Sequence, residues 1–106
     1  MKMLRISNLE EYEALKNNNR RLVIFYSSNQ CEACVDTIPL YERIAKRYHK
    51  RVTLAYCDID ECRLNFEVVP VFVSFYKGHF VNRMEGVNSI NLKLFIKEVI
   101  ETKNII

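Results

Sequence analysis

The sequence predicts a single α/β domain, residues 1–106, in which helices cover both faces of a mixed β-sheet. Segments with the hydrophobic period of strands alternate with segments that have the period of helices. Residues 22–26 are apolar throughout, as a strand buried on both faces must be. Near the C-terminus, Lys77-Gly78-His79 joins two strand-like segments too closely for a helix, which indicates an antiparallel hairpin. A length of 106 residues is typical of one domain.

Residues 3–6 predict a short first strand, and a helix is expected to follow it. Ser7 and Glu10 have the spacing of a capping box with Ser7 as the N-cap. The apolar stripe of this helix is short, and the helix is expected to end in the asparagine run 17–19. The stripe consists of Leu9, Tyr12 and Leu15. Residues 22–26 then form the central strand.

A longer helix is expected over residues 34–48, where Pro39 should introduce a kink. Its predicted apolar stripe consists of Val35, Ile38, Tyr41, Ile44, Ala45 and Tyr48. Basic residues cluster at positions 46–51, where cations complement the helix dipole. The net charge of +3 is mild. We therefore interpret this cluster as a solvated helix end and not as a nucleic-acid patch.

The second half of the chain is rich in strands. Residues 52–59 predict a strand with alternate side chains on opposite faces, and residues 60–66 have room for one or two helical turns. Residues 68–76 and 80–84 form the hairpin strands. The last helix begins near Asn88 or Ser89, and its core stripe consists of Leu92, Phe95, Ile96, Val99 and Ile100.

The segment Cys31-Glu32-Ala33-Cys34 carries the most chemical information. It follows the central strand and stands at the start of the long helix, where the helix dipole favours a thiolate on Cys31. Cys34 lies about one helical turn further on, so its thiol can attack a mixed disulfide on Cys31. Glu32 acts in the opposite direction, because a nearby carboxylate disfavours a thiolate. The sequence leaves that balance open.

Three later landmarks follow this motif in order. They are Pro39, Val69-Pro70 and the glycine pair Gly78 and Gly86. With them, the chain resembles the thioredoxin family over nearly its whole length. The resemblance implies a thioredoxin fold with a central mixed sheet of about five strands. It also implies a thiol–disulfide oxidoreductase that reduces protein disulfides, with Cys31 as nucleophile and Cys34 as resolving thiol.

The resemblance further implies a substrate-binding surface around the first cysteine. A cis bond before Pro70 would turn the Val69 backbone toward Cys31, and a substrate chain could pair with that backbone as an added strand. Gln30, Val69 and Pro70 are the expected substrate-binding residues. No bound cofactor or metal is expected, and the electrons that recycle the site would come from a thioredoxin reductase.

The chain departs from the family at several positions. Gln30 and Ser27 stand where thioredoxins carry tryptophan, and Phe25 and Tyr56 stand where they carry a buried aspartate and its lysine partner. Two alternatives to a reductase stay open. One is a disulfide oxidase or isomerase, and the other is a non-catalytic interaction module that uses its thiols as a switch or a metal clip.

A second cysteine pair, Cys57 and Cys62, is open to several interpretations. Cys57 is expected in the core, on the strand face of Ala55 and Ile59, and Cys62 at the start of a short surface helix. A regulatory disulfide between the two needs Cα atoms within about 7 Å. A zinc site built from all four cysteines would need them to converge on one point. We favour the structural interpretation.

The expected setting is a monomer in the cytoplasm. The N-terminal residues do not resemble a signal peptide, and no segment approaches the roughly 18 apolar residues of a membrane span. In a reducing compartment a CxxC motif more often has a catalytic or metal-binding role than a purely structural one.

Overall fold

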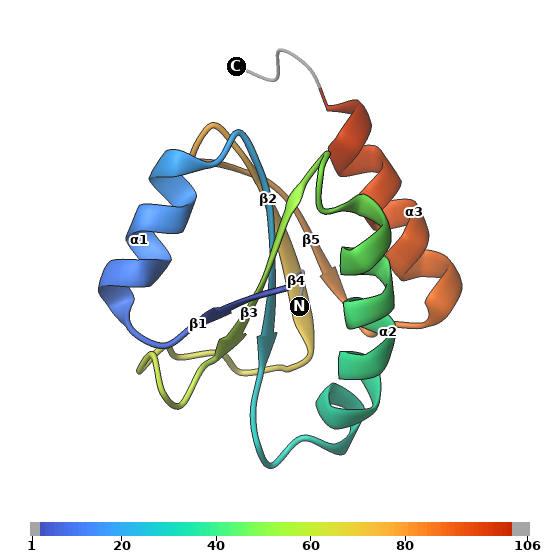
Figure 1. Ribbon diagram of the computed structural model, residues 1–106. Coiled ribbons are helices and arrows are strands. Elements are labelled where there is room, and N and C mark those ends of the chain that lie inside the picture. The colour runs from blue at the N-terminus through green and yellow to red at the C-terminus, as the bar shows by residue number, and fades with distance from the viewer. Residues whose placement is uncertain (1–2, 103–106) are drawn as a thin grey trace.

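The computed structural model describes residues 3–102 as five strands and three helices around one central sheet (Figure 1). In chain order they are β1 (Leu4–Ile6), α1 (Leu9–Asn18), β2 (Arg21–Ser27), α2 (Glu32–Tyr48), β3 (Thr53–Asp58), β4 (Val71–Tyr76), β5 (His79–Glu85) and α3 (Ser89–Glu101).

The sheet is mixed, as predicted. Its strand order is β1-β3-β2-β4-β5, with β1 and β2 parallel to β3, and β4 antiparallel to both β2 and β5. Helix α1 covers one face, and α2 and α3 cover the other (Figure 1). The predicted α/β class with helices on both faces is therefore confirmed. Because β2 is central and parallel to β3, both strands end at the same edge, where the loop to α2 begins.

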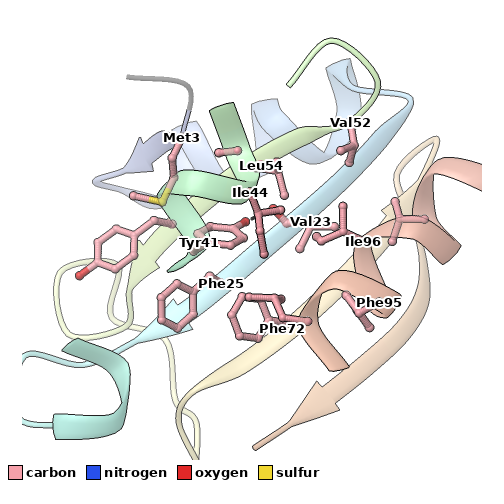
Figure 2. Packing of buried hydrophobic residues seen from close by; sticks show 14 of the residues in the cluster. Met3, Val23, Phe25, Tyr41, Ile44, Val52, Leu54, Phe72, Phe95 and Ile96 are labelled. Carbon is pink, nitrogen blue, oxygen red and sulfur yellow. Dashed lines mark hydrogen bonds between the residues drawn. The ribbon is translucent and has the colours of Figure 1, made fainter. Parts of the chain in front are cut away.

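The face covered by α2 and α3 holds an aromatic core (Figure 2). Phe25 of β2 stacks on Phe72 of β4 with ring centroids 4.6 Å apart, and Tyr41 of α2 meets Phe25 edge-on at 5.3 Å. The buried Tyr41 hydroxyl donates toward the carbonyl oxygens of Val23, at 3.1 Å, and Ala55, at 2.8 Å. This side chain therefore fixes α2 against both central parallel strands.

The opposite face has a thinner cover. Its buried residues come mainly from the strands, and α1 adds the half-buried Tyr12 and Leu15 but no fully buried side chain. The Tyr12 and Tyr26 hydroxyls lie 3.0 Å apart, and Phe66 stacks on the Tyr26 ring at 4.4 Å. The loop after β3 thus contributes to this core together with the helix. Leu9, predicted in the buried stripe, is instead half exposed.

The start of α1 differs from the prediction by one residue. The N-cap is Asn8, whose side chain accepts a hydrogen bond from the Glu11 backbone N–H at 2.9 Å. Glu11, and not Glu10, reaches back to the Ser7 N–H at 2.7 Å. Ser and Asn are both good N-caps, so the preference of the capping residue alone does not distinguish Ser7 from Asn8. The contacts of Tyr12 and Leu15 with the sheet select the register that the structure adopts.

Two further expectations were wrong. Val35 does not lie in the predicted buried stripe of α2 and is 54% exposed, because the first turn of this helix projects beyond the sheet (Figure 1). Residues 60–66 form turns and an open loop instead of a helix. Arg63 in this loop has a φ of 55°, which a right-handed helix does not allow. The hairpin prediction is confirmed, since Lys77 and Gly78 both have positive φ, as a two-residue turn of this kind requires.

Helix α2 runs without a break through Pro39, and α3 begins at Ser89 with Asn88 as its N-cap. None of the helices within residues 3–102 has the length and hydrophobicity needed to cross a membrane.

Candidate active site

Cys31 lies at the N-terminus of α2, shortly after the end of the central strand β2. Strand β2 ends at Ser27, three residues of loop follow, and Cys31 is the N-cap of the helix with an extended backbone. Its sulfur accepts a hydrogen bond from the Cys34 N–H at 3.1 Å, and its carbonyl accepts the first helical bond from the Val35 N–H. A backbone N–H aimed at the sulfur stabilises negative charge there.

Cys31 and Cys34 form a disulfide, with their Cα atoms 5.2 Å apart. The two ends of this bond differ in exposure. Cys31 is half-buried, whereas Cys34 is fully buried in the aromatic core under α2. A reagent that approaches from solvent therefore meets the sulfur of Cys31 first.

The loop that carries Cys31 is attached to the neighbouring loop after β3. The Ser28 hydroxyl donates to the Asp60 carboxylate at 3.1 Å and accepts from the Gln30 N–H at 3.3 Å. The Ser28 carbonyl accepts from the Cys31 N–H at 3.2 Å. The hydrogen bond between Ser28 and Asp60 was not predicted from the sequence. Its signal was that Ser28 and Asp60 each follow a buried strand, and the carboxyl ends of adjacent parallel strands meet at one edge.

Val69 and Pro70 lie on the other side of the first cysteine. The peptide bond between them is cis, as expected. The Val69 carbonyl oxygen is 3.7 Å from the Cys31 sulfur, Val69 is half-buried and Pro70 is buried. The structure therefore brings the backbone of Val69 next to the Cys31 sulfur.

Beside Cys31 the surface has a shallow hollow of about 240 Å³. It is lined by Asn29, Gln30, Glu32, Val35 and Asp36. Gln30 is exposed, as a docking residue must be. Ser27 is not: it is 1% exposed, and its hydroxyl has no hydrogen-bond partner among the described residues. A side chain at position 27 therefore faces the protein interior and cannot itself contact a docked partner.

The core beside Cys34 contains two aromatic residues at directly paired strand positions. Phe25 of β2 is the register partner of Tyr56 of β3, and their rings meet edge-on with centroids 5.7 Å apart. Both belong to the same buried cluster as Cys34. Neither of these two residues, which share the buried cluster of Cys34, offers the second cysteine a carboxylate.

Cys57 and Cys62 do not join the first pair. They belong to the core on the face covered by α1, whereas Cys34 belongs to the opposite face. Their sulfurs are 3.2 Å apart and both side chains are buried. The sheet between the pairs prevents the four thiolates from meeting at one metal. Within residues 3–102, no group of three or more His, Cys, Asp or Glu side chains could hold a metal ion.

The predicted core position of Cys57 is confirmed, while the surface helix predicted for Cys62 is wrong. Cys62 lies in a turn and points inward, with 1% of its surface exposed. Burial raises the pKa of the Cys57 thiol, and its hydrogen bond to Cys62 raises this pKa further.

A bonded CxxC pair at a helix N-terminus, next to a cis-proline and at the end of the central strand, defines a thiol–disulfide oxidoreductase with the thioredoxin fold. Residues 3–98 match the family model for thioredoxin. The chain belongs to the thioredoxin family.

Individual relatives agree with this assignment. The chain is 31% identical over 77 residues to "Thioredoxin-like 3-3" of Oryza sativa subsp. japonica, a match that covers 70% of this chain and 59% of the rice protein. The chain thus spans less than two thirds of that relative. It is 22% identical over 99 residues to the thioredoxin of Coprinus comatus, with 88% and 93% of the two chains covered.

Solved structures show the same fold. Mitochondrial thioredoxin 3 of Saccharomyces cerevisiae, in its oxidised form, aligns with a TM-score of 0.80 at 26% identity over 91% of this chain and 94% of its own. Plasmodium falciparum thioredoxin aligns with a TM-score of 0.84 at 23% identity over 91% and 98%. Family membership and the bonded pair together support protein-disulfide reductase activity.

Proposed function

We propose that this protein reduces protein disulfides by dithiol exchange, with Cys31 as nucleophile and Cys34 as resolving thiol. The Cys31 thiolate attacks one sulfur of a substrate disulfide, and the other substrate sulfur leaves as a thiolate. Cys34 then attacks Cys31, and the second substrate sulfur is released. The substrate gains two electrons, and the Cys31–Cys34 disulfide forms. The observation that carries this proposal is the disulfide between the half-buried Cys31 and the fully buried Cys34.

The substrate chain is proposed to lie across Gln30, Val69 and Pro70. Residues 64–70 lie outside the strands of the sheet, and the Val69 carbonyl is close to the reacting sulfur. An extended peptide can pair with such a backbone segment through main-chain hydrogen bonds, whatever its side chains. The hollow beside Gln30 offers space for the residues next to the substrate cysteine.

We infer that residues 1–106 work as one domain, as a monomer, in the cytoplasm. In a reducing compartment a CxxC motif more often has a catalytic role than a purely structural one, which agrees with the proposed roles of Cys31 and Cys34. No bound cofactor is needed, because the electrons pass through the dithiol itself. A thioredoxin reductase is the proposed electron donor that returns Cys31 and Cys34 to thiols.

Insulin reduction by the recombinant protein with dithiothreitol as electron donor tests this mechanism. Cys31→Ser should abolish the reaction. Cys34→Ser should accumulate a mixed disulfide between Cys31 and the substrate, visible as a covalent adduct by mass spectrometry. Cys57→Ser is the matched control, because it removes a thiol of the same chain from the opposite face, and it should keep at least about half of the activity. Normal turnover by Cys34→Ser would contradict the assigned roles.

A redox titration of the Cys31–Cys34 pair separates a reductase from a disulfide oxidase or isomerase. A reductase should titrate near the thioredoxin potential of about −270 mV, and an oxidant or isomerase near about −180 mV. The second value would overturn the proposed direction of the reaction and leave the roles of the two cysteines intact.

A further inference from the structure

The second cysteine pair has the geometry of a dithiol that can close. Cys57 is the penultimate residue of β3, and Cys62 lies in the turn that follows. Their sulfurs are 3.2 Å apart. A disulfide bond is about 2.05 Å long, so the sulfurs need to approach by only roughly 1.2 Å.

The turn between the two residues holds them in this arrangement. The Cys62 N–H donates to the Asp58 carbonyl at 3.1 Å, and the Leu64 N–H donates to the Ile59 carbonyl at 2.9 Å. The Asp58 carboxylate accepts from the Asp60 N–H at 2.9 Å. These bonds prescribe the path of the backbone without involving either sulfur. A new bond between the sulfurs therefore need not break them.

The two thiols are also ordered by hydrogen-bond contacts, from Cys57 to Cys62 and from Cys62 toward β1. The Cys57 thiol donates to the Cys62 sulfur, and the Cys62 thiol lies 3.6 Å from the Ile6 carbonyl of β1. The lone pairs of Cys62 thus face the other sulfur already. Both side chains are buried, but residues 60, 61 and 63 of the turn are exposed, so opening of this turn brings Cys62 to solvent.

We propose that Cys57 and Cys62 form a second redox couple, whose disulfide closes and opens independently of Cys31–Cys34. Independence follows from the position of the pairs on opposite faces of the sheet. The Cys31 sulfur of the same molecule cannot reach Cys62. The couple is not part of the proposed reductase reaction and does not depend on it.

The oxidant is a small peroxide, such as hydrogen peroxide. Oxidation of the Cys62 sulfur in the opened turn gives a sulfenic acid and one water. The Cys57 sulfur then attacks the sulfenic sulfur, which releases a second water and forms the S–S bond. In total the two thiols lose two protons and two electrons, and one peroxide becomes two waters. A dithiol such as dithiothreitol reverses the change by exchange.

The sequence allows a direct test on the unmodified protein. Trypsin cuts after Arg51 and Arg63, which places Cys57 and Cys62 together on the peptide 52–63, while Cys31 and Cys34 fall on the peptide 22–43. The reduced protein is treated with hydrogen peroxide under native conditions. It is then denatured in the presence of N-ethylmaleimide, digested with trypsin, and its peptides are analysed by mass spectrometry. Peptide 52–63 should lose two hydrogens and carry no maleimide. Dithiothreitol before the block should restore two maleimides.

The same experiment on the double variant Cys31→Ser, Cys34→Ser tests independence, and the Cys57–Cys62 link should form to the same extent. Cys57→Ser is the matched control, and its Cys62 should end as a higher oxide or as the maleimide adduct. Two maleimides on peptide 52–63 of the oxidised wild type would overturn the proposal. So would sulfinic acid in place of the link, or a link that forms only when Cys31 and Cys34 are present.

Discussion

The two cysteine pairs occupy opposite faces of the same sheet, and the difference between their surroundings explains why one pair is placed to react with proteins. Cys31 caps a long helix, has a backbone N–H aimed at its sulfur, and is half open to solvent. Cys57 lies in a strand, donates a hydrogen bond to a second buried thiol, and has no exposed surface. Helix start and strand interior thus give the same side chain opposite properties.

The two faces differ in their covers as well. Helices α2 and α3 supply many buried residues to the face with the active site, while α1 supplies none that is fully buried to the other face. The second pair is therefore shielded mainly by strands and by the turn after β3. Four measurements test whether the two faces differ in this way.

The largest difference is expected in alkylation of the fully reduced, native protein. Cys31 should react with N-ethylmaleimide about 1,000-fold faster than Cys57 or Cys62, because these need a local opening that costs on the order of 4 kcal/mol. Pulsed labelling followed by mass analysis of peptides 22–43 and 52–63 measures both rates. In denaturant the difference should vanish. Equal rates in the native protein would mean that the turn after β3 is open most of the time.

The resolving step on the active-site face should depend strongly on pH. Cys34 must lose its proton to attack Cys31, and the aromatic pair Phe25 and Tyr56 offers it no carboxylate base. The rate should rise about tenfold per pH unit below the ordinary thiol pKa of about 8.5. Stopped-flow release of substrate from the mixed disulfide, from pH 6 to 9, measures this. A flat profile would reveal another base for Cys34, while Cys57→Ser should leave the profile unchanged.

On the opposite face, the buried Cys57 thiol should make the free energy of unfolding of the reduced protein depend on pH in the alkaline range. Burial raises the pKa of Cys57, so the folded state keeps the proton that the unfolded state releases above about pH 8.5. The stabilisation is complete below that pH and is lost as pH rises, by at most about 1.4 kcal/mol per pH unit. Urea unfolding at pH 7.5, 8.5 and 9.5 measures it.

Cys57→Ala is the matched comparison for that loss, since it leaves every other titrating group in place. Its free energy of unfolding should fall less steeply between pH 8.5 and 9.5 than that of the wild type. Burial also raises the pKa of Tyr26 and Tyr41, and both proteins share this contribution of burial, whereas the smaller rise that Cys57 adds to the pKa of Tyr26 is lost in the variant. Identical slopes for the two proteins would show that Cys57 ionises as easily folded as unfolded.

The smallest expected effect is the difference in stability cost between removing the Tyr41 hydroxyl on one face and the Tyr26 hydroxyl on the other. Tyr41→Phe should cost about 1 kcal/mol of stability, because its hydroxyl bonds to the backbone of β2 and β3 in the interior. Tyr26→Phe should cost about 0.5 kcal/mol, because the half-buried Tyr12 hydroxyl that it leaves behind can reach water. Urea unfolding at pH 7 gives both values, and a larger cost for Tyr26→Phe would reverse the ranking of the two faces.

The sequence alone determined the strands, the three long helices and the place of Cys31-Cys34 at a helix start. These features depend on local periodicity and on short spacings, which a chain carries whatever its tertiary contacts. The alternation of residues 52–59 likewise predicts Tyr56 and Cys57 on opposite faces of the sheet, and their separate core clusters confirm it.

Tertiary structure decided the rest. Whether Ser7 or Asn8 caps α1, whether Ser27 faces solvent, and whether residues 60–66 coil into a helix were all undetermined by local preference. Two tertiary contacts depend on how β2, β3 and the turn after β3 are packed. They are the hydrogen bond between Ser28 and Asp60 and the approach of Cys62 to Cys57. Local preference does not select between the possible conformations of these segments. The burial of neighbouring side chains against the sheet selects the one that is observed.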